Sequence, residues 1–367
     1  METRIDFLQW LQVDMGLNIL LCLDDPSDII RASAVSRFWH HFVVAHGLSK
    51  LLCLRLSSQL SSVAYVTEPS RRMKNIADVG PSNSVELEAL EKEHRAYSFL
   101  ARALTTFTAS DCIADAVSAT STDNYPEESI RNTLDPRDRI LRRASYWSSK
   151  GQGDPAVPET LIYKLIANLC IITEISVQPF RAFFQPSHPI YSAKSVRFRM
   201  GHPKSPKDVE NDLKELPLQG PADDKFIWTY TSQEFPMTQE NCLQKFKLPE
   251  PVLCIGGYLQ IELLGRVQRQ EMDGLFYICV SHVEVLGQPL SPVFDVEVLE
   301  PHGKFLLKYY SDAQNHSPPL SHRQLAGSPN PLQENLRGLE QLLNFLHGNV
   351  PDLEPYDWED EDNDLDL

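Results

Sequence analysis

Apolar residues between positions 15 and 43 recur at the spacing of short helices. Met15, Ile19 and Leu23 follow one another at intervals of four residues, which places them on one face of a predicted first helix. Leu20 widens that face. Residues 24–27 (Asp-Asp-Pro-Ser) then predict a turn, because proline fixes its backbone angle and a Ser or Asp side chain can cap the next helix. The segment therefore begins as a helix–turn–helix unit.

A second predicted helix follows the turn, and a third helical stretch runs from Val35 to Trp39. Together they carry the apolar residues Ile29, Ile30, Val35, Trp39, Phe42 and Val43. A segment of fewer than about 50 residues buries too little of its own surface to be stable alone. Each Leu, Ile or Met that a partner covers would contribute about 1.5–3 kcal/mol. We therefore expect this segment to pack against another surface.

The order of these elements resembles the F-box of plant-type F-box proteins. Ile19-Leu20 and Leu23-Asp24 match its first helix, residues 29–35 its second, and Val35-x-x-x-Trp39 its signature ending. The family opens with Leu-Pro, whereas this chain has Leu11-Gln12-Val13-Asp14, without the proline. The resemblance implies that the partner is the Skp adaptor of a cullin-type ubiquitin ligase. It also implies that the adaptor is bound by Leu11, Met15, Ile19, Leu20, Leu23, Asp24, Ile29, Val35 and Trp39. An ordinary three-helix subdomain packed on the rest of the chain would show the same periodicity.

Length and composition indicate a multidomain protein whose cysteines are reduced. Its 367 residues are enough for two or three domains. Seven cysteines without paired spacing predict free thiols, in the cytoplasm or the nucleus. The most apolar stretch, residues 161–177, is interrupted by Lys, Asn and Glu, and the first residues do not form a secretory signal. We therefore expect no association with a membrane.

The net charge of −16 argues against binding to nucleic acid, which requires a basic surface. Nine acidic residues and no Lys or Arg fall within residues 351–367. Such a block predicts a solvated, disordered tail, and a docking peptide for a basic partner is the alternative.

The hydrophobic period changes along the rest of the chain. A further helix is predicted over residues 47–55, and a longer one over residues 83–104 that braces the first helices against the next domain. From residue 111 onward, short alternating runs separated by Gly and Pro predict strands. They are Glu159–Leu165, Ile171–Phe180, Ser195–Met200, Gln244–Leu248, Tyr258–Leu264 and Leu275–Leu286. Many short strands joined by turns indicate a sandwich or a barrel.

The second half of the chain is similar to the discoidin-like, galactose-binding jelly-roll family. The resemblance depends on Trp147-Ser148-Ser149, on residues 258–265 and on residues 283–287, with residues 202–224 as an inserted loop. Trp147 is expected in the core. After this domain, Val293–Leu299 and Lys304–Tyr310 predict a hairpin, and an apolar stripe over residues 336–346 predicts a terminal helix.

The sequence therefore predicts an α+β multidomain chain. Its parts are the F-box and the following helix (1–58), a linker with the bracing helix (59–110), the β-sandwich (111–290), a hairpin, loop and terminal helix (291–350), and the acidic tail (351–367).

Catalytic signatures are missing from the sequence, which has no Gly-rich phosphate loop, no Gly-x-Ser-x-Gly turn, no His-Glu-x-x-His and no Cys-x-x-Cys. No enzyme activity, cofactor or metal is expected. The predicted function is that of a substrate-recognition subunit, with the β-domain binding a protein target through Phe184, His188, Tyr191, Tyr230 and Phe235. Two alternatives remain open, namely a jelly-roll protein that binds a carbohydrate or another small ligand, and a scaffold that binds the adaptor without degradation.

Overall fold

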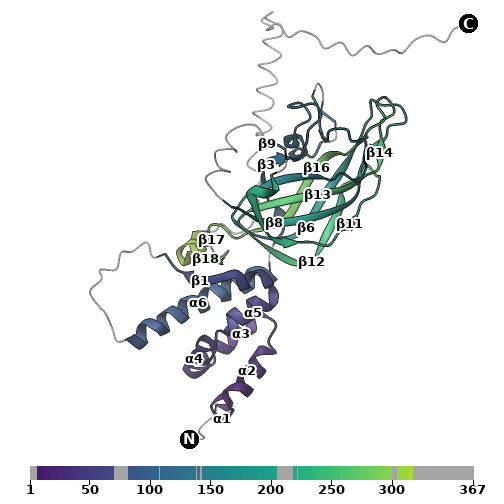
Figure 1. The fold of residues 1–367 in the computed structure, drawn as a ribbon. Helices are drawn as coiled ribbons and strands as arrows, with labels where there is room; N and C mark the ends of the chain where they lie inside the picture. Colours follow the sequence, from purple (N-terminus) through teal and green to yellow (C-terminus); the bar gives the residue numbers. More distant parts are fainter. Residues whose placement is uncertain are drawn as a thin grey trace, which may run out of the picture. The chain divides into compact units, whose positions relative to one another are not determined.

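The computed structural model describes residues 6–69, 82–106, 108–137, 139–140, 143–204, 218–220, 222–299 and 304–316 (Figure 1). Three predictions fall outside these ranges. They are the terminal helix over residues 336–346, the acidic tail over residues 351–367, and most of the predicted inserted loop.

Five short helices begin the chain. They are α1 (Phe7–Trp10), α2 (Val13–Leu21), α3 (Pro26–Ser33), α4 (Arg37–Ala45) and α5 (Leu48–Leu56). The predicted turn is confirmed, because Asp25 accepts a hydrogen bond from the Ser27 amide (2.7 Å) and Pro26 is the first residue of α3. The prediction that Val35 begins the third helix was wrong. Ser36 has an extended backbone and caps α4 by accepting from the Trp39 amide (3.2 Å), which leaves Val35 between two helices.

The predicted bracing helix is α6 (Ser82–Thr105), and it packs on α5, α3 and α4. Its second half is the buried part, with Ala96, Tyr97, Leu100 and Ala101 each at most 1% exposed. The small alanines let the backbones approach closely. This helix therefore closes the side of the N-terminal helices that faces it.

A small sheet joins segments from both ends of the described chain. The predicted hairpin is confirmed as β17 (Phe294–Leu299) and β18 (Lys304–Tyr309). β1 (Val63–Thr67), which follows the short 3-10 helix η1 (Ser58–Ser62), pairs with β18 in parallel. A strand within residues 59–110 was not predicted. Val63, Tyr65 and Val66 are of types that favour strands, but the surrounding residues indicated a linker and the partner of the strand lies far along the chain.

The β-domain is a sandwich of two mainly antiparallel sheets, as predicted for a jelly roll. One sheet has the order β10-β8-β13-β5-β3-β9, with β11 also paired to β8. Its strands are β3 (Ile113–Ala119), β5 (Glu159–Leu165), β8 (Ala193–Pro203), β9 (Leu218–Gln219), β10 (Phe226–Thr231), β11 (Phe235–Pro236) and β13 (Tyr258–Arg266).

The facing sheet has the order β12-β6-β16-β2, with β4 paired to β16 and β7 to β6. Its strands are β2 (Ser110–Asp111), β4 (Trp147–Ser148), β6 (Leu169–Arg181), β7 (Ile190–Tyr191), β12 (Gln244–Ile255) and β16 (Cys279–Pro289). The predicted strand over Leu275–Leu286 is in fact two, because β15 (Phe276–Tyr277) turns back to pair with β14 (Gln268–Arg269) before β16 begins.

The interior between the two sheets is apolar and closed. Trp147 is fully buried there, as predicted, and its indole donates to the Ser121 carbonyl (3.0 Å). All seven cysteines are free thiols, also as predicted.

Strand β6 belongs to two cores. Leu169 and Ile171 at its start pack with the helices and the small sheet, whereas Ile175 and Val177 pack inside the sandwich.

Candidate functional site

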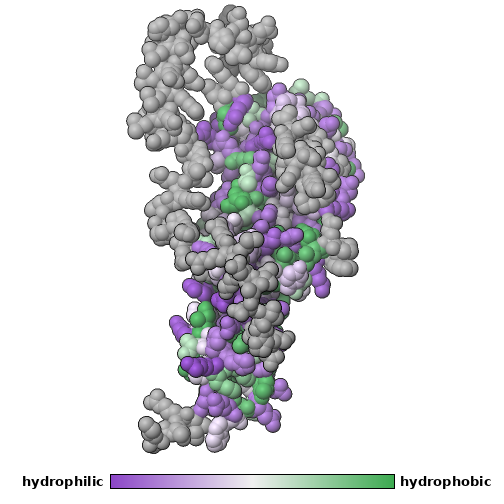
Figure 2. Space-filling view, turned by 90° about the vertical axis from the view of Figure 1, so that its left-hand side faces the viewer, coloured by the Kyte–Doolittle hydropathy of each residue, from purple (hydrophilic) through white to green (hydrophobic). Residues whose placement is uncertain are grey.

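The N-terminal helices leave large apolar side chains in contact with solvent. Eight such residues are more than a third exposed: Phe7, Trp10, Val13, Met15, Ile19, Val35, Phe38 and Leu51. In Figure 2, green hydrophobic residues interrupt the hydrophilic surface of this lower part of the chain. Met15 (53% exposed) and Ile19 (45%) lie one turn apart on α2, while Gly16 and Leu20 of the same helix are buried. We call these eight residues the exposed apolar set.

The nine residues predicted to bind an adaptor divide into two groups. Met15, Ile19 and Val35 belong to the exposed apolar set. Leu20 and Ile29 are each 3% exposed and lie in the core of the helices. The remaining four are Leu11, Leu23 and Trp39, which are partly buried against that core, and the exposed Asp24. The helical period alone could not separate the outward from the inward residues.

Asp6 holds the first helix against the fourth, and sequence reasoning missed it. Its carboxylate accepts from the Leu8 amide (3.2 Å), from the Trp39 indole (2.7 Å) and from the Ser36 hydroxyl (3.3 Å). The Phe7 ring meets Trp39 edge-on, with centroids 5.1 Å apart. Trp39 is thus occupied by contacts within the chain, and α1 presents Trp10, which is 76% exposed.

Arg55 closes the other end of α2. Its guanidinium donates to the carbonyl of Leu21 (2.6 Å), the last residue of α2, and to the carbonyl of Leu23 (2.8 Å), two residues beyond the helix. It also forms an ion pair with Asp24 (3.3 Å). Since carbonyls at a helix end lack partners within the helix, this cation stabilises the position of α2 and its exposed residues.

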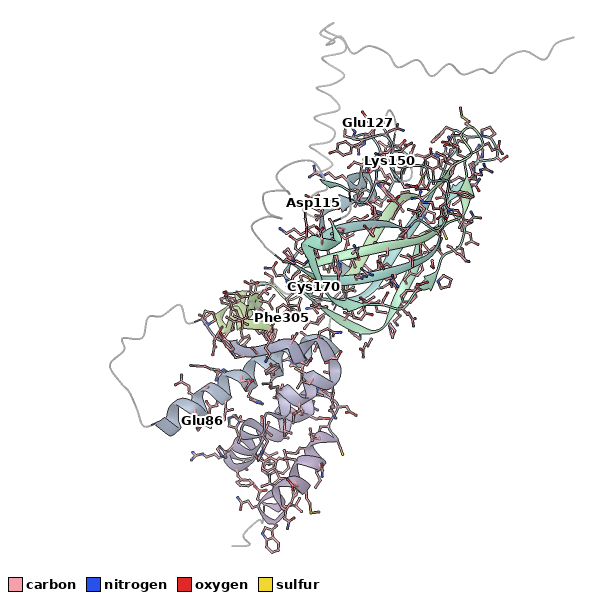
Figure 3. The ribbon with its side chains drawn as sticks, in the orientation of Figure 1. Glu86, Asp115, Glu127, Lys150, Cys170 and Phe305 are labelled. Carbon is pink, nitrogen blue, oxygen red and sulfur yellow. The ribbon has the colours of Figure 1, made fainter. Side chains whose placement is uncertain are left out.

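A second candidate site is a cavity of about 140 Å³ at one end of the sandwich. The loop after β3 supplies Asp123, Asn124 and Glu128, and β6 with its following loop supplies Phe180, Phe184 and Gln185. The cavity is also lined by Tyr146, Tyr191, Tyr277 and Gln270. Figure 3 labels Glu127 and Lys150 at this end of the sandwich and Cys170 at the other, nearer Phe305 of the small sheet.

Hydrogen bonds among the lining residues organise the cavity. Tyr146 donates its hydroxyl proton to Glu128 (2.9 Å), and the Asn124 amide donates to the same carboxylate oxygen (3.0 Å). Tyr277 donates to Asp273 (2.6 Å), and Tyr191 donates to Gln185 (2.6 Å). Each tyrosine hydroxyl is therefore held in one direction by a neighbour.

The local fields shift several ionisation equilibria. Burial and the Asp273 charge raise the pKa of Asp123, while Lys150 acts in the opposite direction. The Tyr277 hydroxyl and the Leu275 amide hold the pKa of Asp273 below its usual value. Burial raises the pKa of Tyr191 to about 12. These tyrosines remain protonated at neutral pH and act as hydrogen-bond donors.

A buried ion pair supports the loops around the cavity. Arg266 at the end of β13 is paired with Glu159, and its guanidinium also donates to the Ser149 hydroxyl (2.8 Å) and to the carbonyls of Lys150 (2.9 Å) and Phe276 (3.0 Å). The Arg266 side chain is 0% and the Glu159 side chain 2% exposed. The segment after β4 and strand β15 are thereby tied to one guanidinium.

The five residues predicted to bind a target are divided by the structure. Phe184 and Tyr191 line the cavity. His188 is exposed on the same loop, with its ring 6.3 Å from Phe183. Tyr230 and Phe235 instead pack against the core of the sandwich, where Phe235 meets Phe198 and Phe246. The structure therefore brings only part of the predicted set together.

One curated protein is similar in sequence to nearly the whole chain. F-box protein At4g00755 of Arabidopsis thaliana is 52% identical over 366 residues, which covers 98% of this chain and 97% of that protein. The chain belongs to the F-box protein family. No family model matches it. In this chain, α2 and α3 correspond to the first two helices of the predicted motif, and α4 to the third, which begins at Arg37 instead of Val35.

Solved structures similar to the F-box protein overlap with about half of it. The family 32 carbohydrate-binding module of Clostridium perfringens NanJ, solved with galactose, is 14% identical, covers 49% of this chain and 92% of its own, and has a TM-score of 0.29. Allantoicase of Saccharomyces cerevisiae is 11% identical, covers 55% of each chain, and has a TM-score of 0.34.

Among the described residues, no group of three or more His, Cys, Asp and Glu side chains is placed to hold a metal ion. No helix in the same residues is both long and apolar enough to cross a membrane.

Proposed function

We propose that this F-box protein is the substrate-recognition subunit of a Skp–cullin–F-box ubiquitin ligase. Its N-terminal helices bind the Skp adaptor, and its β-domain binds the protein to be ubiquitinated. The chain itself performs no chemistry. It raises the effective concentration of the target near the ubiquitin carrier, because a tethered target meets the carrier as part of one complex.

The exposed apolar set is the observation that carries this proposal. Monomeric proteins rarely leave so many large apolar side chains in water within so short a segment, and such residues mark sites of association. Met15 and Ile19 contribute to it from α2, and α4 adds Phe38. Burying two or three of them in a partner supplies the anchoring contacts that dominate a protein interface.

Co-purification with the Skp adaptor tests the proposal. The wild-type chain is expected to be recovered with the adaptor, and the double variant Met15→Asp/Ile19→Asp is expected to lose it, because two carboxylates cannot be buried without counter-charges. Met272 is the matched control, since it is 93% exposed but lies in the β14–β15 turn. Met272→Asp should bind the adaptor like wild type. Equal recovery of the double variant and wild type would overturn the proposal.

A carbohydrate ligand for the β-domain is the second candidate. The observation that favours it is the cavity itself, where aromatic rings stand beside carboxylate and amide groups. Binding of the full chain to a glycan array, lost in Phe184→Ala, would support a lectin-like receptor.

A further inference from the structure

The cavity at the loop end of the sandwich is negatively charged. Asp123 and Glu128 line it, and none of its described lining residues is Lys, Arg or His. Glu128 is only 9% exposed, and neither carboxylate takes part in an ion pair within the described chain. A carboxylate largely removed from water without a counter-ion is favourable only if hydrogen bonds or a positive ligand compensate it.

The cavity also offers more acceptors than donors. The hydroxyl protons of Tyr146, Tyr191 and Tyr277 are donated to neighbouring side chains, which leaves their oxygens as acceptors. The Ser148 hydroxyl donates to the Ser149 carbonyl (3.3 Å). A ligand suited to such a lining must donate hydrogen bonds and accept few. Guanidinium and ammonium groups donate and never accept, whereas a sugar hydroxyl does both.

Aromatic rings form another part of the wall. Tyr146 and Phe180 are stacked with centroids 3.9 Å apart, and Phe184, at 60% exposure, lies 6.3 Å from Phe180. Cations are attracted to the faces of such rings. The chain already uses this pairing beside the cavity, since the Arg139 guanidinium lies 3.6 Å from the centre of the Phe183 ring.

The size of the cavity limits its occupant. At about 140 Å³ it is several times larger than one water molecule requires. It is smaller than the roughly 300–1,000 Å³ of pockets that enclose a drug-sized ligand. It therefore suits the end of one side chain better than an oligosaccharide.

We propose that this cavity binds a cationic side chain, an arginine or a lysine, of the target protein. Glu128 and Asp123 accept hydrogen bonds from the charged group, and Phe184 covers it from the solvent side. The inference rests on the proposed function in taking the ligand to be part of a protein. It adds the chemistry by which the target is chosen.

Ligand-observed saturation-transfer NMR on the purified full chain tests this inference. The probes are N-acetyl-arginine amide, its neutral citrulline analogue and galactose. The arginine compound is expected to bind at least about tenfold more tightly than the citrulline compound, because it donates charge-assisted hydrogen bonds. Glu128→Gln should remove that preference, and it keeps an oxygen that can accept from Tyr146 and Asn124.

Matched variants separate recognition from loss of fold. Glu127 lies next to Glu128 on the same loop, is exposed, and does not line the cavity, so Glu127→Gln should bind like wild type. Phe184→Ala should weaken arginine binding about threefold without changing the melting temperature, because its ring is mostly in solvent.

Three outcomes would overturn the inference. They are no detectable transfer to the arginine compound, equal affinity for the arginine and citrulline compounds, and binding of galactose in preference to both. Adaptor recovery is measured on the same samples. Glu128→Gln should retain the adaptor in every case, so a failure at the cavity is distinct from a failure of the receptor function.

Discussion

The N-terminal helices and the β-sandwich differ in how many large apolar side chains they leave exposed to solvent. Eight large apolar residues are exposed between positions 7 and 51, whereas only six are exposed between positions 111 and 290, a segment about four times longer. Both counts refer to the described residues. The sandwich has enough facing surface to bury its own apolar residues between two sheets. The helices bury theirs on the side of α5 and α6 but not around α2. The comparison separates a sandwich that buries nearly all of its apolar residues within the chain from helices that leave part of theirs in solvent.

The largest expected effect tests how the interior of the sandwich is held together. Arg266→Met removes the cation that pairs with Glu159 and that donates to the segment after β4 and to strand β15. Leaving a carboxylate buried without its partner costs about 3–5 kcal/mol of the free energy of unfolding. Urea unfolding followed by circular dichroism measures the loss.

The double variant Glu159→Met/Arg266→Met controls for the loss of packing. It should recover much of the stability, because no uncompensated charge remains. If Arg266→Met lowers the free energy of unfolding by less than about 1 kcal/mol, this ion pair does not hold the neighbouring segments in place.

A pH dependence tests whether the helices are closed on the side of α6. Burial, with the charges of His40 and Arg95, lowers the pKa of His94 to about 4. In the unfolded chain an imidazole takes up its proton near pH 6.5. Between pH 4 and pH 6.5 the unfolded state therefore binds more protons than the folded state. The free energy of unfolding is highest above pH 6.5 and falls as the pH drops towards 4.

The expected loss at His94 is about 2 kcal/mol between pH 7 and pH 5. Urea unfolding at the two pH values measures it, and His94→Gln should flatten the dependence by that amount. An unchanged slope in the variant would mean that His94 is open to water, and that the helices are incomplete on this side as well.

Removing Asp6 tests the link between α1 and α4. Asp6→Ala deletes the cap on the Leu8 amide and the acceptor for the Trp39 indole, at an expected cost of about 1 kcal/mol. Thermal unfolding followed by circular dichroism measures the change. Gln9→Ala, one turn away and exposed, should alter stability by less than about 0.5 kcal/mol. Similar values for both variants would show that α1 is not fastened through Asp6.

The smallest effect on stability is expected at Met15, where a substitution should have a large effect on adaptor binding. Met15→Ser should change the free energy of unfolding by less than about 0.5 kcal/mol, because the side chain is 53% exposed. The same substitution should weaken adaptor binding, measured by calorimetry. A loss of stability comparable to that of a core substitution would show that Met15 is part of the module's own core.

Much of this fold could be predicted from local patterns. Alternating runs such as Glu159–Leu165 became strands, and the caps at Asp25 and Ser36 are of the residue types that begin helices. β1 was not found in this way, although Val63, Tyr65 and Val66 are of types that favour strands. Its partner is β18, more than 200 residues later, and a short strand is stabilised by its partner more than by its own sequence.

The two sites differ in how far the sequence revealed them. On α2 the helical period identified the apolar residues but not which of them are exposed, since Ile19 is 45% and its neighbour Leu20 is 3% exposed. At the cavity, Phe184 and Tyr191 were found by their aromatic character in a Pro-rich turn. Asp123, Glu128 and Tyr146 were missed, because they meet only when separate loops fold onto one end of the sandwich.

Strand β6 has a consequence for how a target would be presented. It starts in the core shared with the helices and ends beside Phe180 at the cavity. Its 13 residues span roughly 40 Å at about 3.3 Å per residue. A hydrogen-bonded strand of this length is a stiff spacer and not a tether. Under the proposed function, a side chain bound in the cavity would lie at a fixed distance from the N-terminal helices, and that distance would limit which lysines of the target can be modified.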